Sequence, residues 1–483
     1  MFQSVFLNSI INTIYIITVL FVLYLIIKER GEPIRTVAWI MVVVSLPVFG
    51  MILYFYFGQN WRKVKIFSRK GLDDLNIINE LSNKQLNNLS SESIKNKNIA
   101  ENIQLVKLLL NNSKALLSKR NKLKILKDGE QTYPEILDAI EKAQQHIHIE
   151  YYIFEEGDIA NKIIDILIQK ARQGVEVRLI YDDVGSWSLR KKTIQKLKHA
   201  GIEVESFMPV KFPWLTSKIN YRNHRKIIVV DGLEGFIGGI NISDKYINGD
   251  KRFSYWRDTH LKITGDAVAS LQLVFLVDWF FLTRKLENNR SFYFPENSIE
   301  TITPVQITSS GPDSDWASIF QSYILAISKA KKQVFISTPY FVPDHSILNI
   351  IKTSALSGVD VKLIIPAKGD SKVVYWSTLS FIPELIEAGV KIYRYKKGFN
   401  HSKILIVDNS FTSIGTANLD ERSFHQNFEV NAFVYDENFA TQAIEMYKND
   451  LRDSILIDAR QWKRRPWYKK IFESLARLLS PLF

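Results

Sequence analysis

The chain has 483 residues, room for about three structural units at ~150 residues each, and with 46% hydrophobic residues it is not intrinsically disordered. Its net charge of +13 favours an anionic partner. The complete lack of cysteine excludes thiol catalysis, thiolate metal sites and a disulfide framework.

Two long uncharged segments open the chain. Residues 1–27 and 37–57 carry no charged side chain, and each exceeds the ~20 residues needed to cross a hydrocarbon core. Together with the short polar loop between them they predict a transmembrane helical hairpin over residues 1–60, with helices at about 5–27 and 37–57. Pro47 and Gly50 predict that the second helix is kinked or partly re-entrant. A secretory signal peptide would need a basic leader and a cleavage pattern, and both are missing.

Basic residues around the hairpin indicate its orientation. The loop carries three of them, and the segment after the second helix carries five: Arg62, Lys63, Lys65, Arg69 and Lys70. The positive-inside rule therefore predicts a multi-pass cell-membrane protein whose large C-terminal portion lies in the cytoplasm.

The rest of the chain contains an internal repeat. Residues from about 71 to 115 are rich in Asn, Ser, Lys and Leu, and the stretch 61–115 is predicted to be a polar, solvated and partly helical connector. Beyond it, strand and helix patterns alternate as in α/β folds. The segment 174–180 matches 358–364, and 223–231 matches 400–408. These matches predict two homologous halves, residues 116–295 and 296–460, that share one site at a pseudo-twofold interface.

Each half contains the pattern H-x-K-x4-D, followed by a turn that contains glycine and asparagine. The two copies supply the candidate catalytic residues His224, Lys226, Asp231, His401, Lys403 and Asp408. In a strand, His and Lys at positions i and i+2 point to the same face, so both can reach one ligand. The two aspartates follow wholly apolar strand segments and are expected to fix the turn after the strand.

The motifs and their flanking segments resemble the phospholipase D superfamily and, within it, the bacterial cardiolipin synthases. The resemblance covers nearly the whole chain and includes the loop of the N-terminal hairpin and the segments 221–226, 256–260, 338–344, 415–424 and 478–482. It implies an α/β fold of two homologous phospholipase D-like halves, with mixed sheets flanked by helices, packed face to face after the hairpin. One departure is Gly239, which stands where the first turn usually has a hydroxyl, whereas Thr416 keeps it in the second.

The chemistry of a phosphodiester explains these residue types. Lys226 and Lys403 can stabilise the charge that develops on a pentacoordinate phosphorane. Asn241, Thr416 and Asn418 are the candidate phosphate-binding residues of the two turns. One neutral imidazole can attack phosphorus while the other, protonated, delivers a proton to the leaving alkoxide. No metal and no cofactor are required.

The resemblance implies that His224 is the nucleophile and His401 the general acid and base, although the reverse assignment is also compatible with the sequence. It also implies that Asp258 and Glu429, each downstream of the histidine of its own half, are the carboxylates that orient the imidazoles.

The other histidines are expected to lie outside the catalytic pair. His146 and His148 are expected to be half-buried strand residues and His199 a solvated one. Supporting roles for His260, His345 and His425 stay open.

The C-terminal segment 461–483 combines basic residues with apolar ones on one face of a predicted helix. It predicts either a helix at an anionic lipid interface or a helix docked on the protein.

The expected function is that of a cardiolipin synthase: reversible transfer of a phosphatidyl group between two phosphatidylglycerol molecules, giving cardiolipin and glycerol. The expected partners are phosphatidylglycerol and anionic membrane lipid, with no nucleic acid. A membrane-bound phospholipase D that forms phosphatidic acid is the alternative, and a membrane-tethered nuclease a weaker one. Acyl-chain preference and oligomeric state are left open.

Overall fold

The computed structural model describes residues 2–28, 33–54, 73–210, 220–285 and 290–480. The chain divides into two compact units, one formed by residues 1–68 and 210–220 and the other by residues 69–209 and 221–483.

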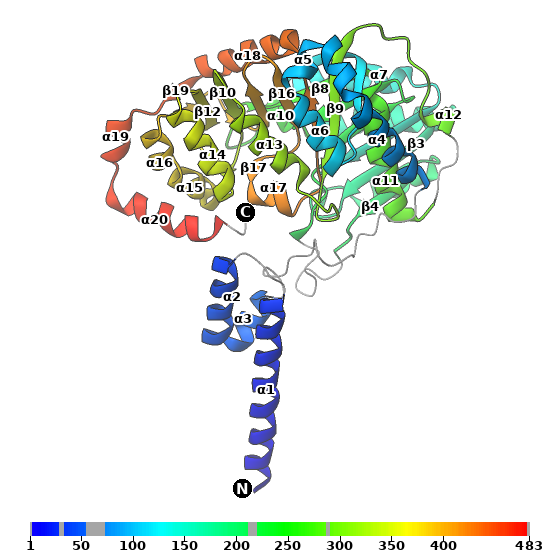
Figure 1. Cartoon of the computed structure of the whole chain (residues 1–483). Coiled ribbons are helices and arrows are strands. Elements are labelled where there is room, and N and C mark those ends of the chain that lie inside the picture. The colour runs from blue at the N-terminus through cyan, green and yellow to red at the C-terminus, as the bar shows by residue number, and fades with distance from the viewer. Residues whose placement is uncertain (1, 29–32, 55–72, 211–219, 286–289, 481–483) are drawn as a thin grey trace. The chain divides into compact units, whose positions relative to one another are not determined.

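The described residues of the first unit form three helices, α1 (Phe2–Lys28), α2 (Pro33–Ser45) and α3 (Pro47–Leu53) (Figure 1). The second predicted helix, 37–57, is broken at Leu46, because Pro47 lacks the N–H that would continue the helix. A Cβ atom at Gly50 would lie 2.5 Å from the carbonyl oxygen of Val42, so glycine permits the close approach of α3 to α2. In the described part of the chain, no helix is both long enough and apolar enough to cross a membrane. Residues 55–57 of the predicted hairpin lie outside the described residues.

Three helices precede the sheet of the second unit: α4 (Asp73–Lys95), α5 (Lys97–Glu101) and α6 (Ile103–Asn112). The described part of the predicted connector, from residue 73, is therefore largely helical, but its end is not solvated. Leu105, Val106, Leu109 and Leu110 of α6 are buried in the core of the second half. The reason is their spacing, which places all four on one apolar helix face.

A single mixed sheet of fifteen strands forms the centre of the second unit. The strands of the first half are β1 (Leu117–Lys127), β2 (His146–Tyr151), β3 (Glu176–Asp182), β4 (Glu203–Phe207), β5 (Lys226–Val230), β6 (Glu234–Gly238) and β8 (Thr259–Gly265). Those of the second half are β9 (Ile302–Ser310), β10 (Gln333–Ser337), β12 (Asp360–Pro366), β13 (Lys391–Tyr395), β15 (Ile404–Val407), β16 (Phe411–Gly415), β18 (Glu429–Val434) and β19 (Ser454–Leu456).

The strand order displays the repeat. From the central antiparallel pair β1–β9, the order runs β8-β6-β5-β2-β3-β4 on one side and β18-β16-β15-β10-β12-β13-β19 on the other. In both halves the strand that begins at the motif lysine or just after it, β5 or β15, pairs antiparallel with β2 or β10. Two pairs of short parallel strands complete the fold: β7 (Trp256–Arg257) with β14 (Phe399–Asn400), and β11 (Phe341–Val342) with β17 (Leu419–Asp420).

Helices flank the sheet (Figure 1). The first half has α7 (Asp128–Lys142), α8 (Asp158–Arg172), α9 (Lys191–His199), α10 (Lys245–Asn248), α11 (Ala267–Thr283) and α12 (Arg290–Tyr293). The second half has α13 (Ser318–Ser328), α14 (His345–Leu356), α15 (Lys372–Ser380), α16 (Ile382–Glu387), α17 (Glu421–His425), α18 (Glu437–Arg452), α19 (Ala459–Lys463) and α20 (Trp467–Leu478). The α/β class with a mixed sheet and flanking helices is thus confirmed.

The two halves share one buried core. Ile227 and Val229 of β5 lie in the same apolar cluster as Ile404 and Ile406 of β15. Since residues i and i+2 of a strand face the same side, the same face of each motif strand looks into this shared core. The core thereby holds the starts of β5 and β15, and with them the two motifs, in a fixed relation.

Candidate active site

Each motif histidine is attached to the backbone of the other half. The His224 N–H donates to the carbonyl oxygen of Phe428 at 2.9 Å, and the His401 N–H donates to that of Arg257 at 2.7 Å. The parallel pair β7–β14 produces the second contact, and the bridge between Asn223 and Phe428 produces the first. The two halves therefore build one site.

The orienting carboxylates are exchanged between the halves. Nδ1 of His224 lies 2.9 Å from Oε2 of Glu429, and Nδ1 of His401 lies 2.7 Å from Oδ2 of Asp258. Asp258 and Glu429 are indeed the carboxylates beside the histidines, but the pairing within each half that their order in the sequence suggested is wrong. The residue before each carboxylate accepts the backbone N–H of the other half's histidine, which places the carboxylate beside that imidazole.

These contacts leave one nitrogen of each imidazole for a substrate. Both Nδ1 atoms are engaged, whereas no hydrogen bond between described residues uses Nε2 of His224 or of His401. Each histidine is 8% exposed, so the imidazoles are nearly but not wholly enclosed. Nε2 is the atom that can attack phosphorus or move a proton.

The two lysines lie deep in the same site. Nζ of Lys226 donates to the carbonyl oxygen of His224 at 2.7 Å, and Nζ of Lys403 donates to that of His401 at 2.5 Å. Nζ of Lys403 also lies 2.9 Å from Nδ1 of His401. Both lysines are buried, and burial lowers the pKa of Lys226 well below its usual value and that of Lys403 to about 8.

Burial and nearby charges favour the neutral form of both imidazoles in the free protein. Burial, helped by the charge of Lys226, lowers the pKa of His224 to about 4, although Glu429 opposes the shift. Burial and the charges of Lys403, Lys245 and Lys226 lower the pKa of His401 well below its usual value. The lysine charges of one motif thus shift the histidine pKa of the other, because all four predicted residues lie in one electropositive site.

Asp231 and Asp408 do not belong to this site. Each ends its strand with a left-handed backbone conformation, at φ 52° and 51°, and its carboxylate accepts backbone N–H groups. Asp231 binds the N–H groups of residues 144–146 and Asp408 those of residues 331–333. Their inclusion among the catalytic residues is corrected: they fix the turn after the strand, as their position in the motif also suggested.

The predicted phosphate-binding residues have different surroundings. Oγ1 of Thr416 donates to Oε2 of Glu429 at 2.5 Å, so this hydroxyl is committed to the carboxylate. The side chain of Asn241 accepts from the Ile153 N–H at 3.2 Å and donates to the Tyr246 hydroxyl at 3.0 Å. Oδ1 of Asn418 is buried without a hydrogen-bond partner among the described residues. Phosphate binding by the two asparagines remains a prediction.

A steric constraint explains why position 239 has a glycine and not a residue with a hydroxyl group. A Cβ atom there would lie 2.1 Å from Oδ1 of Asp258, so the carboxylate occupies the space that a side chain would need. The two histidine–carboxylate pairs are therefore not equivalent: only Glu429 receives a hydroxyl from the adjacent turn.

This difference gives a prediction for Thr416. Thr416→Val removes the donor to Glu429, and leaving a buried charged acceptor without it costs about 1–3 kcal/mol, which corresponds to a rate lower by roughly five- to 150-fold. Thr416→Ser keeps the hydroxyl and is expected to stay close to the wild-type rate. Initial rates for both variants, with melting temperatures to check the fold, test this; equal rates for the two would contradict it.

Several residues around the histidines were not predicted. The Tyr246 hydroxyl lies 3.4 Å from Nδ1 of His401, and the Tyr152 ring lies edge-on to His224 with ring centroids 4.9 Å apart. Nζ of Lys245 lies 4.2 Å from the centroid of the Trp256 ring. Lys245 and Tyr246 lie four and five residues after Asn241 of the first glycine–asparagine turn. This short distance in the sequence could have been used to predict that they lie near the site.

The other histidines outside the motifs have mostly structural surroundings. His146 and His148 are fully buried rather than half-buried, and the side-chain amide of Gln272 on α11 joins them at 3.2 and 2.7 Å. His260 is buried, and neither of its ring nitrogens has a hydrogen-bond partner in the described part of the chain.

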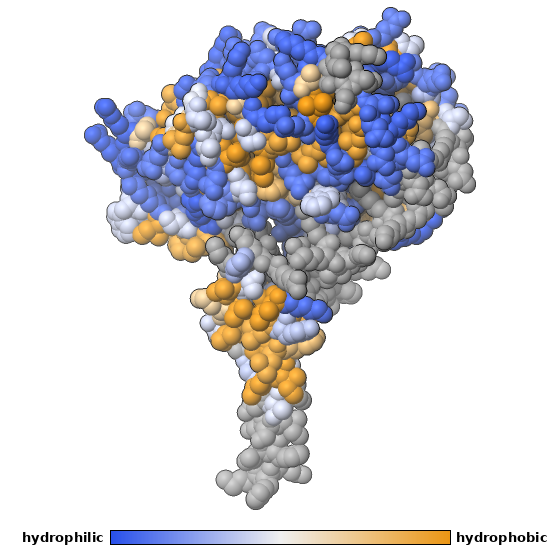
Figure 2. All heavy atoms as spheres, in the orientation of Figure 1, coloured by the Kyte–Doolittle hydropathy of each residue, from blue (hydrophilic) through white to orange (hydrophobic). Residues whose placement is uncertain are grey.

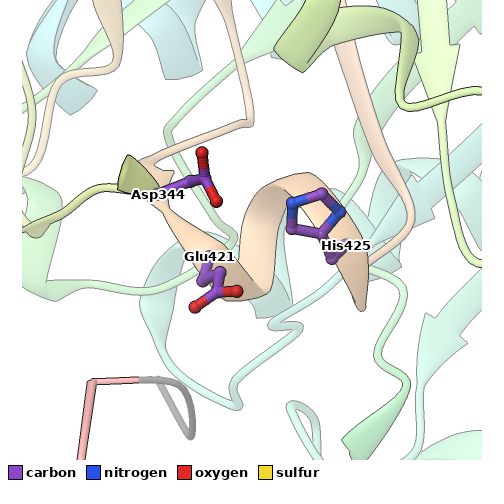
Figure 3. A group of neighbouring side chains, drawn as sticks. All are labelled: Asp344, Glu421 and His425. Carbon is purple, nitrogen blue, oxygen red and sulfur yellow. The ribbon is translucent and has the colours of Figure 1, made fainter. Parts of the chain in front are cut away.

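One group of side chains could hold a cation. Asp344, Glu421 and His425 offer ligand atoms that lie within 4.8 Å of one another (Figure 3). Glu421 and His425 are one turn apart on α17, and Asp344 precedes α14. Two carboxylates and an imidazole suit a divalent cation such as Zn²⁺. The group is partly exposed and does not include the motif residues.

A two-half site with paired His and Lys residues defines a phospholipase D-like protein, and comparisons with known proteins agree. The family described as "Cardiolipin synthase, PLD-like domain" matches residues 136–261 and 323–451, and "Phospholipase D-nuclease N-terminal" matches residues 13–59. A cardiolipin synthase of Alkalihalophilus pseudofirmus is 44% identical over 98% of this chain and 93% of its own. The major cardiolipin synthase ClsA of Bacillus subtilis is 39% identical over 98% and 99%.

The chain therefore belongs to the phospholipase D-like cardiolipin synthase family. The crystal structure of a phosphatidylserine synthase from Haemophilus influenzae has the same fold, with a TM-score of 0.60 and 15% identity, over 80% of this chain and all of that one.

Proposed function

We propose that this protein is a cardiolipin synthase that transfers a phosphatidyl group from one phosphatidylglycerol to another and releases glycerol. The observation that carries the proposal is the pair of imidazoles in one lysine-lined site, each held at Nδ1 by a carboxylate of the other half. Full-length similarity to proteins named cardiolipin synthase supports the choice of lipid substrate.

In the first half-reaction, Nε2 of His224 attacks the phosphorus of phosphatidylglycerol. The bond from phosphorus to the headgroup glycerol oxygen breaks, and His401, protonated, gives its proton to that oxygen. Glycerol leaves, and a phosphatidyl group stays on His224. In the second, His401 takes the proton from the terminal hydroxyl of another phosphatidylglycerol as its oxygen attacks phosphorus. Cardiolipin leaves and both histidines return to their initial states, which makes the transfer reversible.

The cationic side chains lower the barrier by preorganised electrostatics. Lys226 and Lys403 face the position where the equatorial phosphate oxygens gain charge, and Asn241 and Asn418 are proposed to bind the same oxygens. A bound phosphodiester adds a negative charge beside the imidazoles, and a nearby negative charge raises the pKa of an imidazole. Substrate binding thus favours the protonated form of His401 that the leaving group needs.

The two carboxylates support the assignment of roles. Burial raises the pKa of Glu429, but its interaction with Nδ1 of His224 at 2.9 Å, the charge of Lys226 and the Thr416 hydroxyl outweigh burial, so the net pKa is lowered and Glu429 is ionised. An ionised Glu429 on Nδ1–H makes Nε2 of His224 the better nucleophile. Burial raises the pKa of Asp258, which suits a pair that holds and releases a proton.

The lysines give a prediction for the pH dependence. Burial lowers the pKa of Lys403 to about 8. A lysine is charged below its pKa, so kcat/KM should fall as the pH rises through about 8. Lys403→Arg keeps its charge at all these pH values and should move this fall upward, whereas Lys262→Arg, in an ion pair with Glu234, should leave it in place. A fall at the same pH in Lys403→Arg would contradict the assignment.

The N-terminal segments complete the proposal. Residues 5–27 and 37–57 are proposed to insert into the cell membrane as a hairpin, with the catalytic portion in the cytoplasm, because both segments lack charged residues and the basic residues concentrate after the second. Since the chain has no cysteine, Gly31→Cys can be labelled uniquely in intact cells. An impermeant maleimide should label it from outside; labelling only after lysis would contradict this topology.

The experiment that tests the function is a product assay. Purified protein in phosphatidylglycerol vesicles should form cardiolipin and glycerol in equal amounts. Phosphatidic acid as the main product would favour the alternative, hydrolysis by a phospholipase D. Cleavage of oligonucleotides that disappears in His401→Ala would favour a nuclease.

A further inference from the structure

The C-terminal helix α20 is docked on the protein by one face. The ring of Phe472 stacks on that of Trp376 of α15 with centroids 5.1 Å apart. Arg477 donates to Glu384 of α16 at 2.7 Å, and Glu473 and Ala476 are buried. Of the two predictions for this segment, a helix docked on the protein is therefore confirmed. The contacts with α15 and α16 fix the orientation of α20.

The face of α20 that turns away from the protein is apolar and exposed. Figure 2 shows apolar side chains gathered over this helix. Its exposed large apolar residues are Trp467, Tyr468, Ile471, Leu475 and Leu478, together with Phe472, which is partly exposed although its ring stacks on Trp376. Spacings of three and four residues place them on one side of the helix. Leu478 is 76% exposed, and a row of this kind is not expected on a surface that faces only water.

Helix α20 lies at the end of the sheet that carries the active site. It packs on α15, which follows the carboxyl end of β12. The Tyr340 hydroxyl binds Asp370, just before α15, at 2.5 Å, and the Tyr340 ring lies 6.4 Å from that of His401. Helices α15 and α20 lie next to each other in Figure 1.

Two exposed tryptophans lie at the same end. Trp187 is in the loop after β3, whose last residue, Asp182, accepts the backbone N–H of Asn223 beside His224. Trp316 is in the loop after β9, whose last residue, Ser310, pairs with Glu429. Trp187 is 62% exposed and Trp316 55%. Tryptophan and tyrosine favour the interface between lipid and water.

Basic residues flank α20 and follow Trp187, whereas Trp316 is preceded by Asp315. Arg464, just before α20, and Lys469 and Lys470 in its first turn are exposed. Arg190, which is paired with Glu156, and the exposed Lys191 follow Trp187. An apolar face with flanking positive charge complements an anionic bilayer rather than another apolar protein surface.

We propose that the outer face of α20, with Trp187 and Trp316, lies in the headgroup layer of an anionic bilayer and turns the active-site mouth toward the lipid. The inference deepens the proposed function, because a lipid substrate implies a membrane beside the site. The protein would then draw phosphatidylglycerol from the layer in which α20 lies, without extracting it fully into water.

Lipid-quenching of a single label tests the position of α20. The chain has no cysteine, so Leu478→Cys in the full chain can carry one environment-sensitive fluorophore. Leu356→Cys is a matched control, since Leu356 is 72% exposed and lies at the end of α14, just before β12 enters the sheet from the opposite end. Both proteins are placed in vesicles of phosphatidylglycerol and phosphatidylcholine that contain nitroxide-labelled lipid.

The label at position 478 should be quenched several-fold more strongly than the label at 356. Equal quenching at the two positions would overturn the proposal. A second variant, Ile471→Asp with Leu475→Asp, should raise the apparent KM for phosphatidylglycerol in vesicles but not for a short-chain soluble analogue, whereas Leu356→Asp should change neither. Quenching is measured without turnover. Its result therefore tests the position of α20 separately from the proposed function, whichever lipid product the protein forms.

Discussion

Replacement of His224 by alanine should abolish both phosphatidyl transfer and the covalent intermediate. Without the attacking Nε2 no phosphatidyl-histidine can form, and the rate should fall by roughly four orders of magnitude or more. His401→Ala should lower the overall rate to a similar extent, but it leaves the nucleophile in place. With a substrate whose leaving group needs no proton, such as a nitrophenyl phosphodiester, His401→Ala should therefore accumulate the adduct.

Mass spectrometry of acid-free digests checks this pair of expectations. The adduct should be found on the peptide that contains His224 in His401→Ala protein, and it should be absent from His224→Ala protein. If the His224→Ala protein carried the adduct on the peptide of His401, and the His401→Ala protein carried none, His401 would be the nucleophile and His224 the general acid and base. His199→Ala, outside the site, is the control and should behave like wild type.

The second large effect concerns the exchanged carboxylates. Glu429→Gln and Asp258→Asn should each reduce transfer by about 10²- to 10⁴-fold, because the amide no longer stabilises the required tautomer and the imidazolium. The exchanged pairing adds a sharper expectation. Glu429→Gln should change the environment of His224, and Asp258→Asn that of His401, in spite of their order along the chain.

Nitrogen-15 spectra of histidine-labelled protein check the pairing. The Nδ1 signal assigned to His224 should shift in Glu429→Gln and stay in place in Asp258→Asn, and the signal of His401 should behave in the opposite way. Shifts that follow the order of the chain, with His224 responding to Asp258, would contradict the crossed arrangement.

Much of this site could be predicted from the sequence because the repeat duplicates a rare combination of residues. The spacing of His224 and Lys226 on one strand face, and the match to His401 and Lys403, required no tertiary information. The exchange of Asp258 and Glu429 could not be predicted in this way. It arises because β14 pairs with β7 and Asn223 forms a bridge with Phe428, contacts between segments that are far apart in the chain and outside the range of any local pattern.

Two other differences have local causes. His146 and His148 looked like half-buried strand residues because they alternate with isoleucine, but α11 covers their face and the ring of His148 stacks on Phe275 at 4.4 Å. The end of the polar connector was expected to be solvated, yet α6 buries four apolar side chains, because the low mean hydropathy of the segment concealed a short amphipathic helix.

The most direct test is a crystal structure of the protein with tungstate or vanadate, oxyanions that mimic a five-coordinate phosphorus. The metal atom should be bonded to Nε2 of His224, with one of its oxygens hydrogen-bonded to Nε2 of His401 and others contacting Lys226 and Lys403. An oxyanion bound by only one histidine, or bound elsewhere, would contradict the claim that both imidazoles serve a single phosphorus atom.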